Sequence, residues 1–335
     1  MYKRTKKLED WFESLLLEQK KTDEKSFVFN NIKVKKIKNH FEIDHKVSNT
    51  QKQTEVIFGF KWNKTNTYKD GINQVLSKWL KKKYKKKFYG NSIKHGSTLL
   101  DAGCGSALSA RLLFGNNLKK LNYIGTDISD SVNVAKKELN KIGVKNVLFK
   151  CDLNKLPLKK ESIDLIFSEG VLHHTDNPFK TLKKITHFLK PSGIIMFYVY
   201  KKKAPIREFS DKLIRDKLKE LKPQEAWKNL IPLTKLGREL GRLNKTINIE
   251  DDIELLEIPK GRIKIQRLFY WYIFKAFFNE RLSLSEMHHI NFDWYSPINA
   301  STHTEKEVRD WCKKLKINIL DITVDKAGIS IIAKK

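Results

Sequence analysis

Residues 98–107 constrain the fold of this chain more than any other segment. Their sequence, TLLDAGCGSA, runs from an apolar stretch into an acidic residue and two closely spaced glycines, and a helical pattern follows over about 108–114. Glycines in such a turn let a ligand lie against bare backbone, which a Cβ would block. The segment therefore predicts a strand, a tight ligand-binding turn and a helix, in that order.

The acidic residue of this turn indicates the charge of the ligand. A dinucleotide pyrophosphate binds helix N–H groups and is repelled by a nearby carboxylate. Asp101 stands at the turn and therefore favours a cationic ligand without phosphate. S-adenosylmethionine has both properties, because it carries a sulfonium and an ammonium group.

Three more apolar stretches follow, and each ends in an acidic or glycine residue. Residues 121–127 end at Asp127, about 20 residues past the glycines, where an acid can accept the ribose hydroxyls of an adenosine. Residues 147–153 bring Asp152 to a position where we expect it to meet the adenine amino group, and residues 162–170 end with Glu169 and a glycine. Polar groups at the carboxyl ends of successive strands are typical of the ligand crevice in open α/β sheets.

Over residues 97–200 the chain resembles the class I S-adenosylmethionine-dependent methyltransferases. The motifs that carry the resemblance are LLDAGCGSA, YIGTDIS, FKCDLNKLP, ESIDLIFSEGVLHHTDNP and LKPSGIIMFYVY. A narrower subgroup shares FGFKWNK (58–64), FDWYSP (292–297) and THTEKEVRDWCKKL (302–315). The resemblance implies an α/β Rossmann-like fold, with a seven-stranded sheet and helices on both faces. Ser192 departs from the glycine that many relatives carry there, and Gly193 remains.

The resemblance also implies a binding site for S-adenosylmethionine as the cofactor. Asp101, Gly103 and Gly105 would line its methionine moiety, Asp127 its ribose, and Asp152 with Leu153 its adenine. The full set of expected cofactor residues is Asp101, Gly103, Cys104, Gly105, Asp127, Ile128, Asp152, Leu153 and Glu169.

The patterning predicts four parts of the chain. They are a basic N-terminal extension (1–95), the cofactor-binding core (96–200), a helical insertion that acts as a substrate lid (201–300), and a closing helix and β-hairpin (301–335). Within the extension we expect an amphipathic helix over 6–20, a small β element or an irregular lead-in over 26–60, and a helix over 66–90. The closing hairpin pairs 317–324 with 328–334, and in this fold the final antiparallel strand inserts beside its neighbour.

Methyl transfer from a sulfonium needs an acceptor held in line, and a hydroxyl acceptor also needs a base. His173 and His174, just past the fourth strand, are the candidate bases, since neutral imidazole suits the task. The alternative is that one of them packs and shapes the pocket. Tyr200 is a third candidate with packing as its alternative, whereas we expect Glu169 to orient cofactor or acceptor.

Substrate contacts are expected from the lid. Trp294 and Tyr295 could enter the pocket, or form a hinge between lid and core, and Arg215, like Arg207, could bind a carboxylate or phosphate on the acceptor. The aromatic stretch 267–278 has three interpretations: a lid helix, which we favour, an apolar acceptor channel, or a membrane-surface contact.

Composition limits the partners. The net charge of +29 concentrates before residue 97 and peaks at KKKYKKK (81–87), which could follow a phosphate backbone. Lysine greatly outnumbers arginine, however, which favours a solvated surface or one that steers an anionic substrate. The three separated cysteines favour neither a disulfide framework nor a zinc site, and no metal is expected. No apolar run is long enough for a membrane span, so we expect a cytoplasmic protein.

The sequence thus predicts methyl transfer from S-adenosylmethionine to a small or medium metabolite, such as a sugar, a lipid-linked intermediate or a secondary metabolite, with O-methylation favoured. It lacks the N/D-P-P-Y/F tetrapeptide of base-amine methyltransferases and a suitably placed nucleophilic cysteine for cytosine C5 chemistry. The alternatives are an RNA methyltransferase that uses the basic extension, and a non-catalytic cofactor-binding subunit of a larger assembly. The oligomeric state does not follow from the sequence.

Overall fold

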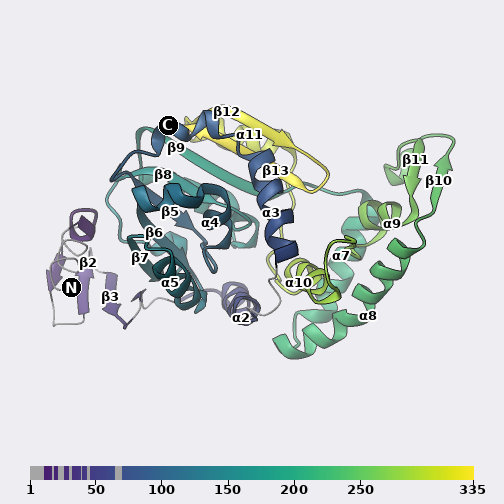
Figure 1. The fold of residues 1–335 in the computed structure, drawn as a ribbon, viewed down its shortest axis with the longest axis horizontal. Helices are drawn as coiled ribbons and strands as arrows, with labels where there is room; N and C mark the ends of the chain where they lie inside the picture. Colours follow the sequence, from purple (N-terminus) through teal and green to yellow (C-terminus); the bar gives the residue numbers. More distant parts are fainter. Residues whose placement is uncertain are drawn as a thin grey trace.

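A single mixed sheet organises the molecule (Figure 1). The computed structural model describes residues 11–16, 19–21, 26–29, 32–38, 40–43, 46–64 and 70–335. In this part of the chain the sheet has eleven strands, in the order β1-β2-β3-β4-β7-β6-β5-β8-β9-β13-β12. Seven of them are the predicted core strands: β5 (Thr98–Ala102), β6 (Asn122–Asp127), β7 (Asn146–Lys150), β8 (Ile163–Ser168), β9 (Leu189–Tyr200), β12 (Asn318–Val324) and β13 (Gly328–Lys334).

The directions and the burial of these core strands match the fold predicted from the sequence. β5 to β9 run parallel, and β5 and β6 are buried along their whole length, as near-continuous apolar strands covered on both faces should be. β13 lies antiparallel between β9 and β12, which is the insertion predicted for the last strand. The Rossmann-like fold class is therefore confirmed.

The sheet is wider than the seven strands predicted. Four short strands of the N-terminal extension continue it: β1 (Gln19–Lys21), β2 (Ser26–Phe29), β3 (Ile32–Lys36) and β4 (Phe41–Ile43). β4 pairs in parallel with β7, so the predicted small β element joins the core sheet instead of standing apart. Residues 11–13 are helical, but residues 19–21 are a strand, so the helix expected over 6–20 ends early; residues 1–10 lie outside the described residues.

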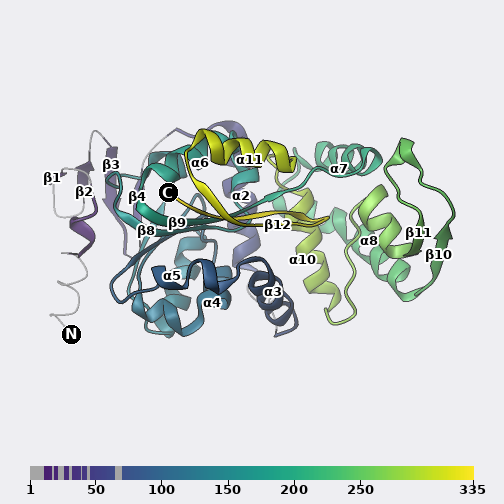
Figure 2. The ribbon, with the colours of Figure 1, turned by 90° about the horizontal axis from the view of Figure 1, so that it is seen from above.

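Helices cover both faces of the sheet, as Figure 2 shows. One face packs against α3 (Asp70–Lys83), α4 (Leu108–Phe114) and α5 (Ser131–Lys141), and the other against α6 (Pro178–His187) and α11 (Glu305–Lys314). α2 (Asn49–Asn63) occupies a stretch that was expected to be β or irregular, and it contacts α5, α8 and α10.

The lysine-rich run at the end of α3 turns partly inward. Lys83 and Tyr84 are buried, and Lys83 pairs with Asp325 in the turn between β12 and β13. The run is therefore not a continuous solvated face, because its two central residues belong to the packing of α3 on the sheet.

The insertion lies beyond the carboxyl end of β9 (Figure 1). It contains α7 (Pro205–Leu218), α8 (Pro223–Arg242), the hairpin β10 (Thr246–Ile249) and β11 (Gly261–Lys264), α9 (Ile265–Leu268) and α10 (Leu284–Tyr295). The aromatic stretch is not the single helix that we favoured: α9 passes into a π-helical turn, η8 (Phe269–Ile273), and residues 274–279 are extended or irregular. Among the described residues, no helix combines the length and apolarity needed to cross a bilayer.

Candidate functional site

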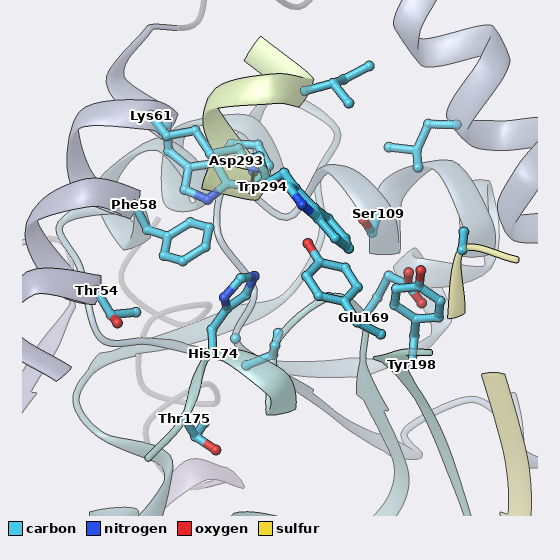
Figure 3. Close-up of a pocket in the computed structure, with 18 of the residues that line it drawn as sticks. Thr54, Phe58, Lys61, Ser109, Glu169, His174, Thr175, Tyr198, Asp293 and Trp294 are labelled. Carbon is cyan, nitrogen blue, oxygen red and sulfur yellow. Dashed lines mark hydrogen bonds and ion pairs between the residues drawn. The ribbon is translucent and has the colours of Figure 1, made fainter. Parts of the chain in front are cut away.

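A cavity of about 380 Å³ lies where the carboxyl ends of the core strands meet the insertion. One wall comes from the loops after β5, β6, β7 and β8, and the opposite wall from α7, η8 and α10 of the insertion, while α2 and α3 close a third side. In Figure 3, His174, Asp293 and Trp294 face one space, with Phe58 beside His174 and Glu169 toward the opposite end. The volume is in the range of small-molecule sites.

The glycine turn after β5 forms part of the cavity wall. Gly103 has a φ of +83° and lines the cavity, and a Cβ there would lie 2.3 Å from the side chain of Val171. At Gly105, with a φ of +51°, a Cβ would lie 2.6 Å from the ring of Trp62. Trp62 from α2 therefore covers this bare backbone, and both glycines are required by conformation and by space.

Six of the nine predicted cofactor residues line the cavity: Gly103, Asp127, Ile128, Asp152, Leu153 and Glu169. The carboxylate of Asp127 accepts the backbone N–H groups of Gly105 and Ser129, both at 2.9 Å. This ties the glycine turn to the end of β6. Asp152 accepts the backbone N–H of Asn154 at 2.7 Å and so holds the turn after β7.

The other three predicted cofactor residues, Asp101, Cys104 and Gly105, lie behind the cavity wall. Asp101 is 4% exposed and accepts the hydroxyl of Tyr123. Burial raises the pKa of Asp101 to about 7, and the hydrogen bond from Tyr123 opposes the rise. In this position Asp101 shapes the turn from beneath, which is a different role from the direct contact that the resemblance implies.

Glu169, in the loop after β8, is another acidic group that lines the cavity. It accepts a hydrogen bond from the hydroxyl of Tyr84, the buried tyrosine that follows Lys83. Burial raises the pKa of Glu169 to about 8, although Tyr84 and Lys83 both act to lower it. A cation bound in the cavity would stabilise the ionised form of this carboxyl group.

The two adjacent histidines have different surroundings. His174 lines the cavity, and its Nδ1 lies 2.5 Å from the carbonyl oxygen of Asn299. A carbonyl only accepts, so Nδ1 carries the proton and Nε2 is the free basic nitrogen. Burial lowers the pKa of His174 to about 4, so it is neutral near pH 7. His173 is fully buried, outside the cavity lining, with neither ring nitrogen hydrogen-bonded.

Tyr200 connects the histidines to the insertion. Its ring stacks on His173 at a centroid distance of 3.6 Å and lies 4.3 Å from the ring of Trp294. Tyr200 lines the cavity. The structure thus brings His174 and Tyr200 of the predicted catalytic set to the cavity, and gives His173 the packing role that was its alternative.

Of the three predicted substrate residues, only Trp294 lines the cavity. Tyr295 is fully buried, and its hydroxyl donates to Asp211 at 2.9 Å. Arg215 donates to the backbone carbonyl of Trp294 at 3.2 Å and stacks against its indole. Tyr295 and Arg215 therefore support Trp294 from behind.

A buried carboxylate, Asp211 on α7, organises this part of the insertion. It pairs with Arg207 at 2.8 Å and accepts the indole N–H of Trp294 at 2.8 Å, in addition to the hydroxyl of Tyr295. Arg207 also donates to the backbone carbonyl of Tyr270 in η8. The guanidinium of Arg207, one of two predicted anion-binding arginines, is thus already neutralised within the protein.

The ion pair of Asp293 and the cavity-lining lysines Lys203 and Lys275 were not predicted from the sequence. Asp293 of α10 forms an ion pair with Lys61 of α2. Lys203 and Lys275 are buried lysines of the insertion that also line the cavity. Lys61 and Asp293 lie within the FGFKWNK and FDWYSP motifs, which was an available signal, whereas nothing distinguishes Lys203 and Lys275 among so many lysines.

Part of the chain is similar to known methyltransferases. Residues 93–256 match a family described as a methyltransferase domain. The chain is 35% identical over 108 residues to (S)-coclaurine N-methyltransferase of Papaver somniferum. The matched segment covers 31% of this chain and 29% of that protein. It is 30% identical over 118 residues to an uncharacterized methyltransferase, YodH, of Bacillus subtilis, covering 35% of this chain and 49% of YodH. The chain thus spans less than half of the length of these curated relatives.

Solved structures with a similar chain course include 1,6-didemethyltoxoflavin-N1-methyltransferase of Burkholderia thailandensis. That structure is 11% identical, with a TM-score of 0.44, covering 95% of this chain and 99% of the other. A methyltransferase from Aquifex aeolicus is 16% identical, with a TM-score of 0.39, covering 77% and 97%. The family match over residues 93–256 confirms the predicted resemblance to S-adenosylmethionine-dependent methyltransferases.

The role of Asp211 can be tested by measuring the free energy of unfolding of a variant. Asp211→Ala leaves the buried guanidinium of Arg207 without its counter-ion, and we expect it to lower the free energy of unfolding by about 3–5 kcal/mol. Asp216→Ala is the matched control on the same helix, since Asp216 pairs with Lys212 at the surface, and we expect little change. Urea unfolding measures both; equal effects of the two variants would contradict the central role of Asp211.

Proposed function

We propose that this chain, of which residues 93–256 match a methyltransferase domain, transfers a methyl group from S-adenosylmethionine to a small or medium metabolite, most readily at a hydroxyl group. The observation that carries the proposal is that one cavity joins the acidic strand ends to His174 and Tyr200. Cofactor and acceptor would thus meet in a single enclosed space, with S-adenosylmethionine on the core wall and the acceptor on the insertion wall. The division of the chain at residues 95, 200 and 300 is part of the proposal.

The core wall fits S-adenosylmethionine. Gly103 offers backbone without a Cβ, and Asp127, Asp152 and Glu169 place three carboxyl groups on the same wall. Carboxyl groups suit the hydroxyl and amino donors of an adenosine and the positive charge of a sulfonium. When bound, the cofactor supplies an electrophilic methyl group, and the protein needs to align the acceptor and exclude water.

His174 is the proposed base for a hydroxyl acceptor. Its Nδ1–H is held by the carbonyl of Asn299, so its Nε2 is an acceptor for the proton that the hydroxyl loses. The nearby carboxylate of Asp293 raises the pKa of His174 against the effect of burial. Asp293 would therefore stabilise the imidazolium as it forms.

The fold gives little support to the alternative that the protein is an RNA methyltransferase. The basic run 81–87 loses two of its seven residues to the interior, where Lys83 pairs with Asp325 and Tyr84 hydrogen-bonds Glu169. These two residues support the cavity and do not present a surface for phosphates. A non-catalytic subunit would not need His174 with a free Nε2 at the cavity.

Cofactor binding tests the proposal first. We expect calorimetric titration to show micromolar binding of S-adenosylmethionine and S-adenosylhomocysteine. Asp127→Ala should weaken binding by about ten- to a hundredfold, because it removes charge-assisted hydrogen bonds worth about 1.5–3 kcal/mol. Asp130→Ala, an exposed acid in the same turn that pairs with Lys150, is the control and should bind normally. Failure of the unaltered protein to bind either compound would refute the proposed function.

The raised pKa of Glu169 predicts a pH effect on binding. With a pKa of about 8, Glu169 is largely protonated at pH 7, and a bound sulfonium favours its ionised form. Binding therefore releases a proton, and the affinity for S-adenosylmethionine should rise with pH up to about 8 and then level off. S-adenosylhomocysteine lacks the sulfonium and should show a shallower rise.

Glu169→Gln should remove the difference between the two pH profiles, measured by calorimetry in buffers of different ionisation enthalpy. Asp130→Asn is the control and should keep the difference, because Asp130 is an exposed acid that pairs with Lys150 and lies outside the cavity lining. If the affinity of Glu169→Gln for S-adenosylmethionine still rose steeply with pH, the proton released on binding would come from another group.

The proposed base can be tested with any acceptor found in a panel of sugars, phenols and lipid-linked hydroxyl compounds. His174→Gln should lower kcat by about 10²–10⁴-fold without changing the Kd of S-adenosylhomocysteine. Because the pKa of His174 is about 4, kcat/KM should not fall until the pH drops below about 5. His187→Gln, at an exposed histidine of α6, is the control, and equal rates in both variants would exclude His174 as the base.

A further inference from the structure

The indole of Trp294 stands among four cationic side chains. The ammonium of Lys275 lies 4.3 Å from the centroid of its ring, and that of Lys203 lies 5.6 Å away. The guanidinium carbons of Arg207 and Arg215 lie at 5.2 and 5.3 Å. Lys203, Arg207, Lys275 and Trp294 all line the cavity, so the insertion wall concentrates positive charge at one place.

The carboxylates in this part of the cavity already have partners. Asp211 is engaged by Arg207, by the indole of Trp294 and by the hydroxyl of Tyr295. Asp293 is paired with Lys61 across the cavity wall. Neither carboxylate is therefore available as the principal counter-ion of the two lysines.

Within the described part of the chain, Lys203 and Lys275 form no ion pair. Lys275 is 6% exposed, and its ammonium donates only a long hydrogen bond, 3.4 Å, to the carbonyl of Ile290. Lys203 is 8% exposed and donates to the carbonyls of Lys201 and Ala327, at 2.6 and 2.7 Å. Each ammonium has three N–H donors, so donor capacity remains on both.

Burying an ammonium without a counter-ion is unfavourable, and the protein keeps two of them. Burial, together with the nearby charge of Arg207, lowers the pKa of each lysine to about 7. An anion bound at this place would remove the penalty and restore both lysines to the charged form. Residues kept at a cost to stability are typical of binding sites.

We infer that the methyl acceptor carries an anionic group, a carboxylate or a phosphate, that binds Lys203 and Lys275 beside Trp294. The inference rests on the proposed function, and it adds the class of substrate to it. The aromatic lining from Tyr200, Tyr270 and Trp271 would receive an apolar or aromatic body attached to that anion. The anion would fix one end of the acceptor on the insertion wall, which leaves its hydroxyl for the region of His174.

Simple probes can test the anion site without knowledge of the natural acceptor. Protein saturated with S-adenosylhomocysteine is titrated with benzoate, with phenyl phosphate and with the neutral benzamide, and tryptophan fluorescence and heat are recorded. We expect at least one anion to bind at least about tenfold more tightly than benzamide. Preference for benzoate would indicate a carboxylate acceptor, and preference for phenyl phosphate a phosphate acceptor.

The variants Lys203→Met and Lys275→Met keep most of the side-chain volume and remove the charge. Each should weaken binding of the preferred anion by about tenfold or more and leave binding of S-adenosylhomocysteine unchanged. Lys275→Met should also keep or raise the Tm, because it removes a buried charge, so misfolding would be recognised. Lys212→Met, at an exposed position of α7, is the control and should bind the anion normally.

Two outcomes would overturn the inference. In the first, the unaltered protein binds benzamide as well as the anions, or binds none of the anions, while S-adenosylhomocysteine still binds. In the second, the affinity for the anion is unchanged in both lysine variants. In both cases the proposed function would stand and the anionic acceptor would be wrong. If the unaltered protein did not bind S-adenosylhomocysteine, the proposed function itself would be contradicted.

Discussion

The insertion depends on the buried carboxylate of Asp211. This one group joins α7 to α10 through hydrogen bonds to Trp294 and Tyr295, and it neutralises the guanidinium of Arg207. The network extends to η8, because Arg207 donates to the carbonyl of Tyr270 and the hydroxyl of Tyr295 accepts the backbone N–H of Lys275. A polar network in a low-dielectric interior is rigid only when its members are satisfied. Asp211 thereby fixes the indole that forms the insertion wall and the backbone that carries Lys275.

The cavity is divided by charge. The core wall presents Asp127, Asp152 and Glu169. The insertion wall presents Lys203 and Lys275, whereas Asp293 on the same wall is paired with Lys61. Because opposite charges favour opposite ligands, this arrangement would let the cavity distinguish the proposed cationic cofactor from the proposed anionic acceptor. In this interpretation the two ligands also attract each other, and their separate walls set the direction in which they meet.

The sequence predicted the core well because its signals are local. A parallel strand covered on both faces is written as an apolar run, and the glycines at 103 and 105 stand where a Cβ would meet Val171 or Trp62. The four strands that widen the sheet were only partly visible, since short strands of three to five residues carry little periodicity. The π-helical turn at 269–273 was not predicted, because the aromatic stretch has the composition of an ordinary buried helix. The electrostatic partner of each charged side chain was the least predictable feature. Arg207 was the predicted anion ligand and Lys203 was not singled out, and the fold shows that Asp211 pairs with Arg207 and not with Lys203.

The fold brings the two motifs FGFKWNK and FDWYSP into contact at the cavity wall. Lys61 in FGFKWNK and Asp293 in FDWYSP are far apart in sequence, yet they form an ion pair at the cavity wall. Gln53 of α2 strengthens the same junction, since it donates to the carbonyl of Ser296 at 2.7 Å and accepts the N–H of Ile298 at 3.1 Å. The junction places Asp293 near enough to His174 to raise its pKa. An extension outside the core and a helix of the insertion therefore act together on the proposed base. Breaking the ion pair between Lys61 and Asp293 would therefore change the pKa of His174, even though neither residue needs to touch the reacting atoms.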